Sequence, residues 1–165
     1  SLFPLYKTNK SNKEKSSNFG NPQGIIKVAK DNVGVNYQIA HMGGEIELKK
    51  FIKNNEIKVL LNPILETKPV EQYSWTYQIL KACIDLPNVY VDTSFSCYKP
   101  EYHLLIKVLL NHNILSNKII YGTDFHLNKT VAGMKNYIDD FIKVIGKQNF
   151  LKIAEENSYK FFKIK

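Results

Sequence analysis

Three short apolar runs, separated by segments with helical periodicity, constrain the fold of this chain most strongly. The runs are VNYQIA at 35–40, NVYVDTS at 88–94 and KIIY at 118–121. Each run is apolar on both faces, and a helical segment precedes the next one, as in parallel strands that helices cover. The sequence therefore predicts an α/β fold in which parallel strands alternate with helices.

Proline and serine mark the beginnings of several predicted helices. Pro22 and Pro100 suit the first turn of a helix, where no backbone N–H is required, and Ser74 suits an N-cap. The polar, lysine-dotted residues 1–21 are expected to form a loop, and residues 57–61 a short additional strand. The predicted helices cover residues 22–30, 45–54, 75–86, 100–113, 131–145 and 148–162.

Composition excludes several classes of protein. The 165 residues are 44% hydrophobic and 23% charged, which fits one globular domain and excludes a disordered chain, a collagen-like repeat and a disulfide scaffold. No run of about 18 apolar residues occurs, so no membrane partner is expected. Cys83 and Cys97 form neither a C-x-x-C pair nor a zinc pattern, which is typical of a reducing compartment, and we expect a cytoplasmic protein.

The net charge of +8 raises the question of nucleic-acid binding. All 23 basic residues are lysine, however, and the chain has no arginine, the side chain that most often reads phosphate and guanine through paired hydrogen bonds. The chain is also rich in asparagine and isoleucine, so the lysine excess agrees with a biased source composition. Nucleic acid is therefore not expected as a partner.

Polar residues follow each predicted strand at the end where parallel α/β proteins build their sites. His41 follows the first strand, on which it would share a face with Tyr37 and Ile39. The pair Gly43-Gly44 allows a sharp turn after it and leaves space beside the ring. From this motif alone, a hydrogen-bonded histidine at a strand end and a site histidine remain equal alternatives.

Asp124 is stronger evidence for a functional site than His41 is. It directly follows Ile-Ile-Tyr-Gly-Thr, and a carboxylate buried there is costly unless it is paired, hydrogen-bonded or metal-bound. A helix N-cap is the alternative. Together, His41 and Asp124 at equivalent ends of different strands favour a metal or proton-transfer site. Asp92 ends the middle strand and either orients His41 or caps a turn. His126 either contacts substrate or metal, or faces water as a loop histidine.

Three other reactive side chains are not expected in a site. His103 and His112 lie in the predicted helix after Pro100, so we expect them at the surface or in helix packing. Nothing in the sequence near Cys97 indicates an activated thiolate, and a nucleophilic role is not expected.

The segments IAHMGG, NVYVDTS, KIIYGTDF and EENSYKFF resemble, in this order and spacing, the C-terminal half of the metal-dependent amidohydrolase superfamily. The closest resemblance is to its amidohydrolase-related hydrolases and decarboxylases, and it covers about residue 21 to the end. It implies that residues 22–165 form strands six to eight of a TIM-type (β/α)8 barrel with their helices and a C-terminal helix. Residues 1–21 would be a loop on the active-site side, and residues 1–165 the C-terminal portion of a longer protein.

The resemblance also implies roles for individual residues. Asp124 matches the eighth-strand aspartate, which binds metal and helps to activate a metal-bound water. His41 matches the sixth-strand histidine, which ligates a second metal or carries protons. The residues expected to contact the substrate or to support these two are Gly43, Gly44, Asp92, Thr123 and His126.

The first-strand His-x-His and the fifth-strand histidine of the family have no counterpart in this chain. A catalytic zinc site usually has three protein ligands and a water, whereas the matched positions supply two, Asp124 and His41. The resemblance therefore implies one divalent ion, with zinc the expected metal, whose remaining ligands lie upstream of this chain. Alone, these 165 residues are not expected to be a competent enzyme.

The function implied by the resemblance is that of a metal-dependent hydrolase, or a non-oxidative decarboxylase, acting on a small-molecule substrate. Two alternatives stay open. The first is a catalytically silent barrel remnant that acts as a scaffold or binds a partner. The second is a TatD-like metal-dependent nuclease, which the positive charge favours and the lack of arginine disfavours. An open half-barrel would expose apolar sheet edges, so a homo-oligomer is a further expectation.

Overall fold

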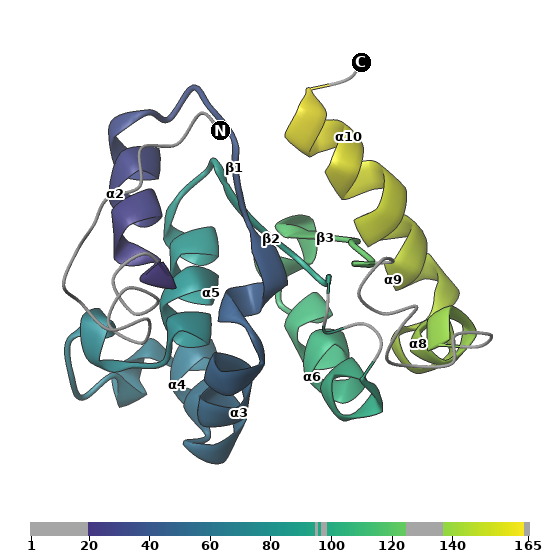
Figure 1. Cartoon of the computed structure of the whole chain (residues 1–165), viewed down its shortest axis with the longest axis horizontal. Helices are drawn as coiled ribbons and strands as arrows, with labels where there is room; N and C mark the ends of the chain where they lie inside the picture. The colour runs from purple at the N-terminus through teal and green to yellow at the C-terminus, as the bar shows by residue number, and fades with distance from the viewer. Residues whose placement is uncertain (1–19, 95, 97–98, 125–136, 164–165) are drawn as a thin grey trace, which may run out of the picture.

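The computed structural model describes residues 20–94, 96, 99–124 and 137–163, in which helices and strands alternate along the chain (Figure 1). The strands are β1 (Tyr37–Ile39), β2 (Val89–Asp92) and β3 (Ile119–Ile120). The helices are α2 (Gln23–Asp31), α3 (Glu45–Lys53), α4 (Glu56–Leu61), α5 (Trp75–Asp85), α6 (Pro100–Leu110), α8 (Tyr137–Ile145), α9 (Lys147–Leu151) and α10 (Asn157–Phe162). The short 3-10 turns are η1 (Ala40–Gly43), η2 (Pro63–Leu65), η3 (Val70–Gln72) and η4 (Leu115–Asn117), and the π turn is η5 (Lys152–Glu156).

The three strands form one parallel sheet in the order β1-β2-β3. Tyr37 lies opposite Val89, and Val91 lies opposite Ile119. In Figure 1 the sheet runs through the middle, with α2 to α5 on the left and α6, α8 and α10 on the right. The predicted alternation of parallel strands with helices is therefore confirmed for the described residues, and the eight-stranded barrel stays a prediction.

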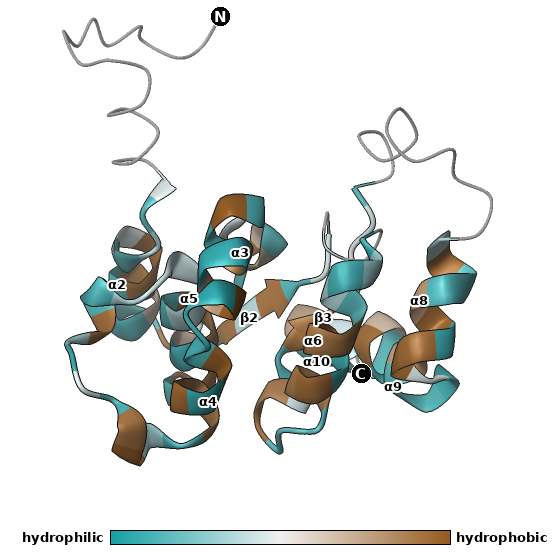
Figure 2. Ribbon diagram, turned by 90° about the horizontal axis from the view of Figure 1, so that it is seen from below, coloured by the Kyte–Doolittle hydropathy of each residue, from teal (hydrophilic) through white to brown (hydrophobic). Residues whose placement is uncertain are grey.

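The core forms where the sheet meets α5 and α6. Val89 and Val91 of β2 and Ile119 of β3 are fully buried, as are Leu80 of α5 and Ile106 of α6. Figure 2 shows β2 as a largely apolar strand between helices that carry both apolar and polar stripes. Each such side chain contributes about 1.5–3 kcal/mol by leaving water, so this contact stabilises the packing of the sheet on its helices.

Asn157, at the start of α10, connects the C-terminal helix to β3 through hydrogen bonds. Its fully buried amide donates to the carbonyl of Ser116 at 2.9 Å and to that of Ile119 at 2.7 Å. The Tyr121 N–H donates to the Ile153 carbonyl, 2.9 Å away in the π turn η5. The predicted C-terminal helix thus contains a π turn at the place where it meets the end of β3.

The prediction of a strand at 57–61 is wrong, because these residues belong to helix α4. The buried residues of α4 are Glu56 and Leu60, which are spaced by one helical turn rather than by two residues. Asn55 has a left-handed backbone with a φ of 54°, and it connects α3 directly to α4. Apolar content alone does not distinguish helix from strand in so short a segment.

Several segment boundaries also differ from the sequence predictions. Strand β1 ends at Ile39, and the 3-10 turn η1 takes up the residues that follow. Of the helix predicted at 131–145, residues 131–136 lie outside the described part of the chain, as do residues 1–19 of the expected N-terminal loop.

Among the residues that the structure describes, no helix has both the length and the apolar character needed to cross a bilayer.

Candidate functional site

The carboxyl ends of the three strands bring His41, Ser94 and Asp124 together. The strands are parallel, so the residues that follow them lie at the same edge of the sheet. The Nδ1 atom of His41 lies 3.2 Å from Oδ2 of Asp124 and 2.9 Å from the hydroxyl oxygen of Ser94. His41 and Asp124, which the sequence places at the ends of different strands, are therefore in direct contact.

The backbone at His41 differs from the extended one that the sequence predicts. His41 lies after β1 with φ 60° and ψ 18°, so it does not share a strand face with Tyr37 and Ile39, and that prediction is wrong. Asp124 also has a positive φ, 46°. Left-handed backbone costs roughly 1–2 kcal/mol for a residue with a Cβ, and it is concentrated at functional sites. Surrounding contacts must stabilise both members of the pair.

Asp92, at the end of β2, supplies such contacts to His41. Its side chain is buried, and its Oδ1 accepts the backbone N–H of His41 at 2.9 Å and that of Ser94 at 3.1 Å. The Ser94 hydroxyl also donates to Oδ1, and the Gln38 amide donates to Oδ2 at 2.6 Å. Asp92 therefore positions His41 and caps the turn at Ser94, which combines the two roles that the sequence left open.

The contacts at Nδ1 define which nitrogen of His41 carries a proton. The Ser94 hydroxyl gives its hydrogen to Asp92 and faces Nδ1 with a lone pair. The Asp124 carboxylate lies 3.2 Å from Nδ1 as an ion-pair contact that attracts a proton there, although its Oδ2 accepts no hydrogen bond among the described residues. Nδ1 is therefore the protonated nitrogen in the neutral ring, and Nε2 carries the lone pair. This arrangement is not that of a serine triad, in which serine and aspartate contact opposite nitrogens of the histidine.

Gly43 and Gly44 shape the turn that follows His41, and both have a positive φ, 88° and 87°. A Cβ on Gly43 would lie 3.3 Å from Cβ of Trp75 and from the backbone nitrogen of Thr76, so glycine lets the turn pack directly on the start of α5. No described atom outside its chain neighbours lies within 4 Å of a Cβ at Gly44, so the need for glycine there is conformational.

The remaining predicted residues lie in different environments. Thr123 is half-buried next to Asp124, and His126 lies outside the described residues. His103 is buried in α6 and lies edge-on to Phe141 of α8, with ring centroids 5.2 Å apart. This contact is the helix-packing role expected for His103.

The donor pair fits part of a metal site. Two ligands of a tetrahedral zinc ion, each about 2.0–2.1 Å from the metal, lie about 3.4 Å apart. The separation of His41 Nδ1 and Asp124 Oδ2, 3.2 Å, is close to this value. Within residues 20–94, 96, 99–124 and 137–163, no group of three His, Cys, Asp or Glu side chains could hold a metal ion. Nδ1 can bind a metal only when it carries no proton, so the pair offers two ligands in that tautomer and Asp124 alone when the proton stays on Nδ1.

An open pocket of about 970 Å³ lies beside the pair, and both His41 and Asp124 contribute to its lining. Its other walls come from α3 and from the segment that leads through η3 into α5. A volume of this size accommodates a small organic molecule. The pair therefore borders a space large enough for a small-molecule substrate.

Sequence reasoning missed two buried carboxylates in this region, Glu47 and Glu56, and the hydroxyl of Ser94. Oε2 of Glu47 accepts the N–H of Trp75 at 2.8 Å, and Oε2 of Glu56 accepts the N–H of Ser74 at 3.2 Å. Both carboxylates satisfy N–H groups at the start of α5. The polar run DTS at the end of the second apolar segment was the available signal for Ser94. The two glutamates carry no local signal, since their partners are 28 and 18 residues away.

Comparisons of the chain with family models, with curated proteins and with solved structures give no match. The resemblance to amidohydrolases therefore stays a prediction from motifs.

Proposed function

We propose that this chain is part of a metal-dependent hydrolase in which His41 and Asp124 hold and move protons at the reacting centre. The observation that carries the proposal is the 3.2 Å contact between His41 Nδ1 and Asp124 Oδ2, made at the ends of two different strands beside an open pocket. Acid–base groups at the carboxyl edge of a parallel sheet are the usual location of chemistry in α/β enzymes.

A divalent ion bound here would supply a hydroxide near neutral pH and polarise the bond to be cleaved. Among the described residues, Asp124 would hold it, and His41 would act either as a second ligand or as the proton carrier. The proposal requires at least one further ligand from outside the described residues. His126 is the candidate nearest to Asp124 in the sequence.

The chain's own side chains account for the proton transfers. With a proton on Nδ1, His41 uses its Nε2 lone pair as a general base, and the imidazolium that results is stabilised by the Asp124 carboxylate 3.2 Å from Nδ1. The protonated ring then returns a proton to the leaving group. General acid–base catalysis of this kind contributes about 10²- to 10⁴-fold to a rate.

The test is metal-dependent turnover of a panel of activated esters and amides by the natural full-length protein. Asp124→Asn preserves the shape of the side chain and removes its charge, so we expect turnover to fall by at least about 100-fold. The matched control is Asp139→Asn, an exposed position in α8, which should keep the wild-type rate. Circular dichroism establishes that both variants are folded.

Two results would contradict the proposal. The first is wild-type turnover by a folded Asp124→Asn variant. The second is turnover that neither falls on treatment with a chelator nor returns on addition of zinc. A folded full-length protein that binds no metal and hydrolyses nothing in the panel would favour the catalytically silent scaffold instead.

A further inference from the structure

The pocket beside His41 and Asp124 is acidic, although the chain as a whole carries a net charge of +8. Lysine outnumbers the acidic residues in the sequence, 23 to 15, yet Lys50 is the one lysine among the described residues of the lining. The carboxylates of the lining are those of Glu45, Glu47, Glu56, Glu71 and Asp124.

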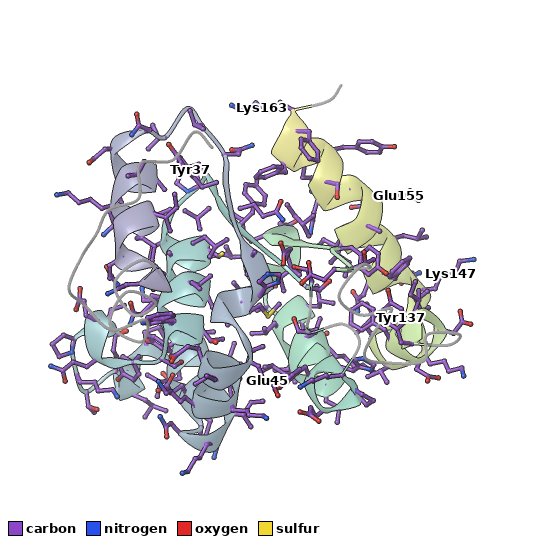
Figure 3. All side chains as sticks on the ribbon, viewed as in Figure 1. Tyr37, Glu45, Tyr137, Lys147, Glu155 and Lys163 are labelled. Carbon is purple, nitrogen blue, oxygen red and sulfur yellow. The ribbon has the colours of Figure 1, made fainter. Side chains whose placement is uncertain are left out.

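Lysines balance two of these carboxylates. Lys50 contacts Glu47 at 2.5 Å. Glu45, at the start of α3 on the side of α6 (Figure 3), contacts Lys49 at 2.7 Å and Lys99 at 2.5 Å. Even with Lys49, Lys99 and Lys68 counted, the last of which lies over the Tyr73 ring of the lining, five carboxylates meet four lysines. The charge of the pocket therefore remains negative.

The other carboxylates have no lysine partner among the described residues. Glu56 is 2% exposed and accepts hydrogen bonds from the N–H and the hydroxyl of Ser74. Glu71 is exposed at the pocket wall, and Asp124 contacts the His41 ring. A ligand that enters the pocket can thus contact the exposed Glu71 carboxylate, while the buried Glu56 acts on it only through its charge.

The pocket also offers apolar and aromatic surface. Ile46 of α3 is 73% exposed and lines the pocket, as does the half-buried Trp75 at the start of α5. Tyr73 also lines the pocket, but its buried ring is stacked on Tyr77, and the Lys68 ammonium lies 4.2 Å from its centroid. Aromatic faces attract ammonium groups through the ring quadrupole, an effect of about 0.5–2 kcal/mol. Apolar walls with carboxylates and the Trp75 ring suit a molecule that combines an apolar body with a positive charge.

We propose that the pocket binds an organic cation, an amine- or ammonium-bearing molecule with an apolar part, and that this class supplies the substrate of the hydrolase centre. The second half of this statement depends on the proposed function, and the first half does not. A carboxylate ligand in the part of the pocket between α3 and α5 would meet repulsion from Glu56 and Glu71.

The single tryptophan of the chain, Trp75, lies in the pocket wall and reports binding through its fluorescence. The probes are benzyltrimethylammonium, benzyl alcohol and benzoate, which share an aromatic ring and differ in charge. We expect the cation to bind at least about tenfold more tightly than benzoate at low ionic strength, and the difference to shrink in about 0.5 M salt. Isothermal titration calorimetry on the same samples measures binding independently of Trp75.

Glu71→Gln removes one pocket charge at an exposed position, and we expect it to weaken cation binding about threefold. The matched control is Glu155→Gln. Glu155 is also exposed, but it lies on the C-terminal helix on the opposite side of the molecule (Figure 3), so this variant should bind as the wild type does.

Three results would overturn the pocket proposal: benzoate that binds as tightly as the cation, equal effects of the two glutamate substitutions, or no saturable binding of any probe. His41→Gln separates this proposal from the proposed function, because it should abolish hydrolysis and retain the preference for the cation. A cation preference in a protein without hydrolytic activity supports the pocket and contradicts the hydrolase. Hydrolysis without that preference contradicts the pocket alone.

Discussion

Replacing Asp92 by alanine should lower the free energy of unfolding by about 3 kcal/mol. The buried carboxylate accepts the backbone N–H groups of His41 and Ser94, the Ser94 hydroxyl and the Gln38 amide. Each buried N–H left without an acceptor costs about 1–3 kcal/mol. The low end of this range, about 1 kcal/mol for each N–H, applies here because water reaches the pocket beside His41. The two N–H groups and the hydroxyl together give about 3 kcal/mol, and the exposed Gln38 adds little.

Urea unfolding followed by circular dichroism measures this change. A loss of about 3 kcal/mol corresponds to a fall in Tm of roughly 6–12 °C for a chain of this size. The matched control is Asp85→Ala at the end of α5, where the carboxylate is exposed and its contact with Lys81 is an (i, i+4) ion pair of 2.6 Å. Such surface pairs contribute about 0.5 kcal/mol or less.

Asp92→Asn separates hydrogen bonding from charge. The asparagine oxygen keeps the acceptor for His41 and Ser94, and the exposed Gln38 amide can rotate to meet the new NH2 group. We therefore expect a loss of about 1 kcal/mol. The reasoning is refuted if Asp92→Ala is no more destabilising than Asp85→Ala.

Three further predictions concern stability and protonation. Glu56→Ala should lower the free energy of unfolding by about 2–3 kcal/mol, because the buried carboxylate caps α5. Urea unfolding measures this change, and a loss below about 0.5 kcal/mol would contradict the capping role. Burial raises the pKa of the Cys83 thiol to about 12. In a Cys97→Ser background, Cys83 should therefore react with a thiol reagent only after the chain unfolds, and rapid reaction of the folded chain would contradict its burial. The hydrogen bond from Lys49 holds the pKa of Glu45 below its usual range, so this pair should stabilise the fold above about pH 4.5 and lose its effect as the pH falls through the lowered pKa. Carboxyl NMR should show a higher Glu45 pKa in Lys49→Ala, and an unchanged value would rule out this cause.

The elements that the sequence predicted correctly are those with a local cause. The alternation of apolar runs with helices predicted the parallel sheet. Parallel strands bring their carboxyl ends to one edge of the sheet, and His41 and Asp124 are in contact there. The N-cap at Ser74 follows from residue type alone and is present, since its hydroxyl accepts the N–H of Tyr77 at 3.2 Å.

The elements that the sequence did not predict depend on contacts between distant segments. Glu56 is buried because Ser74, 18 residues away, offers it an N–H and a hydroxyl. The left-handed turn at His41 depends on Asp92, 51 residues away, which accepts its N–H. Periodicity describes what one segment buries and contains no information about such partners. The roles that the amidohydrolase resemblance implies for Asp124 and His41 remain predictions until chemistry is measured.

The measurement that addresses the His41–Asp124 pair most directly is nitrogen-15 NMR of the His41 imidazole in the metal-free protein. We predict that the neutral ring carries its proton on Nδ1, because the Ser94 hydroxyl oxygen accepts there and the Asp124 carboxylate lies 3.2 Å away and attracts the proton electrostatically. The Nδ1 proton should exchange faster with water in Asp124→Asn. A neutral ring protonated on Nε2, or an Nδ1 signal unaffected by Asp124→Asn, would contradict the pairing on which the proposed proton transfers depend.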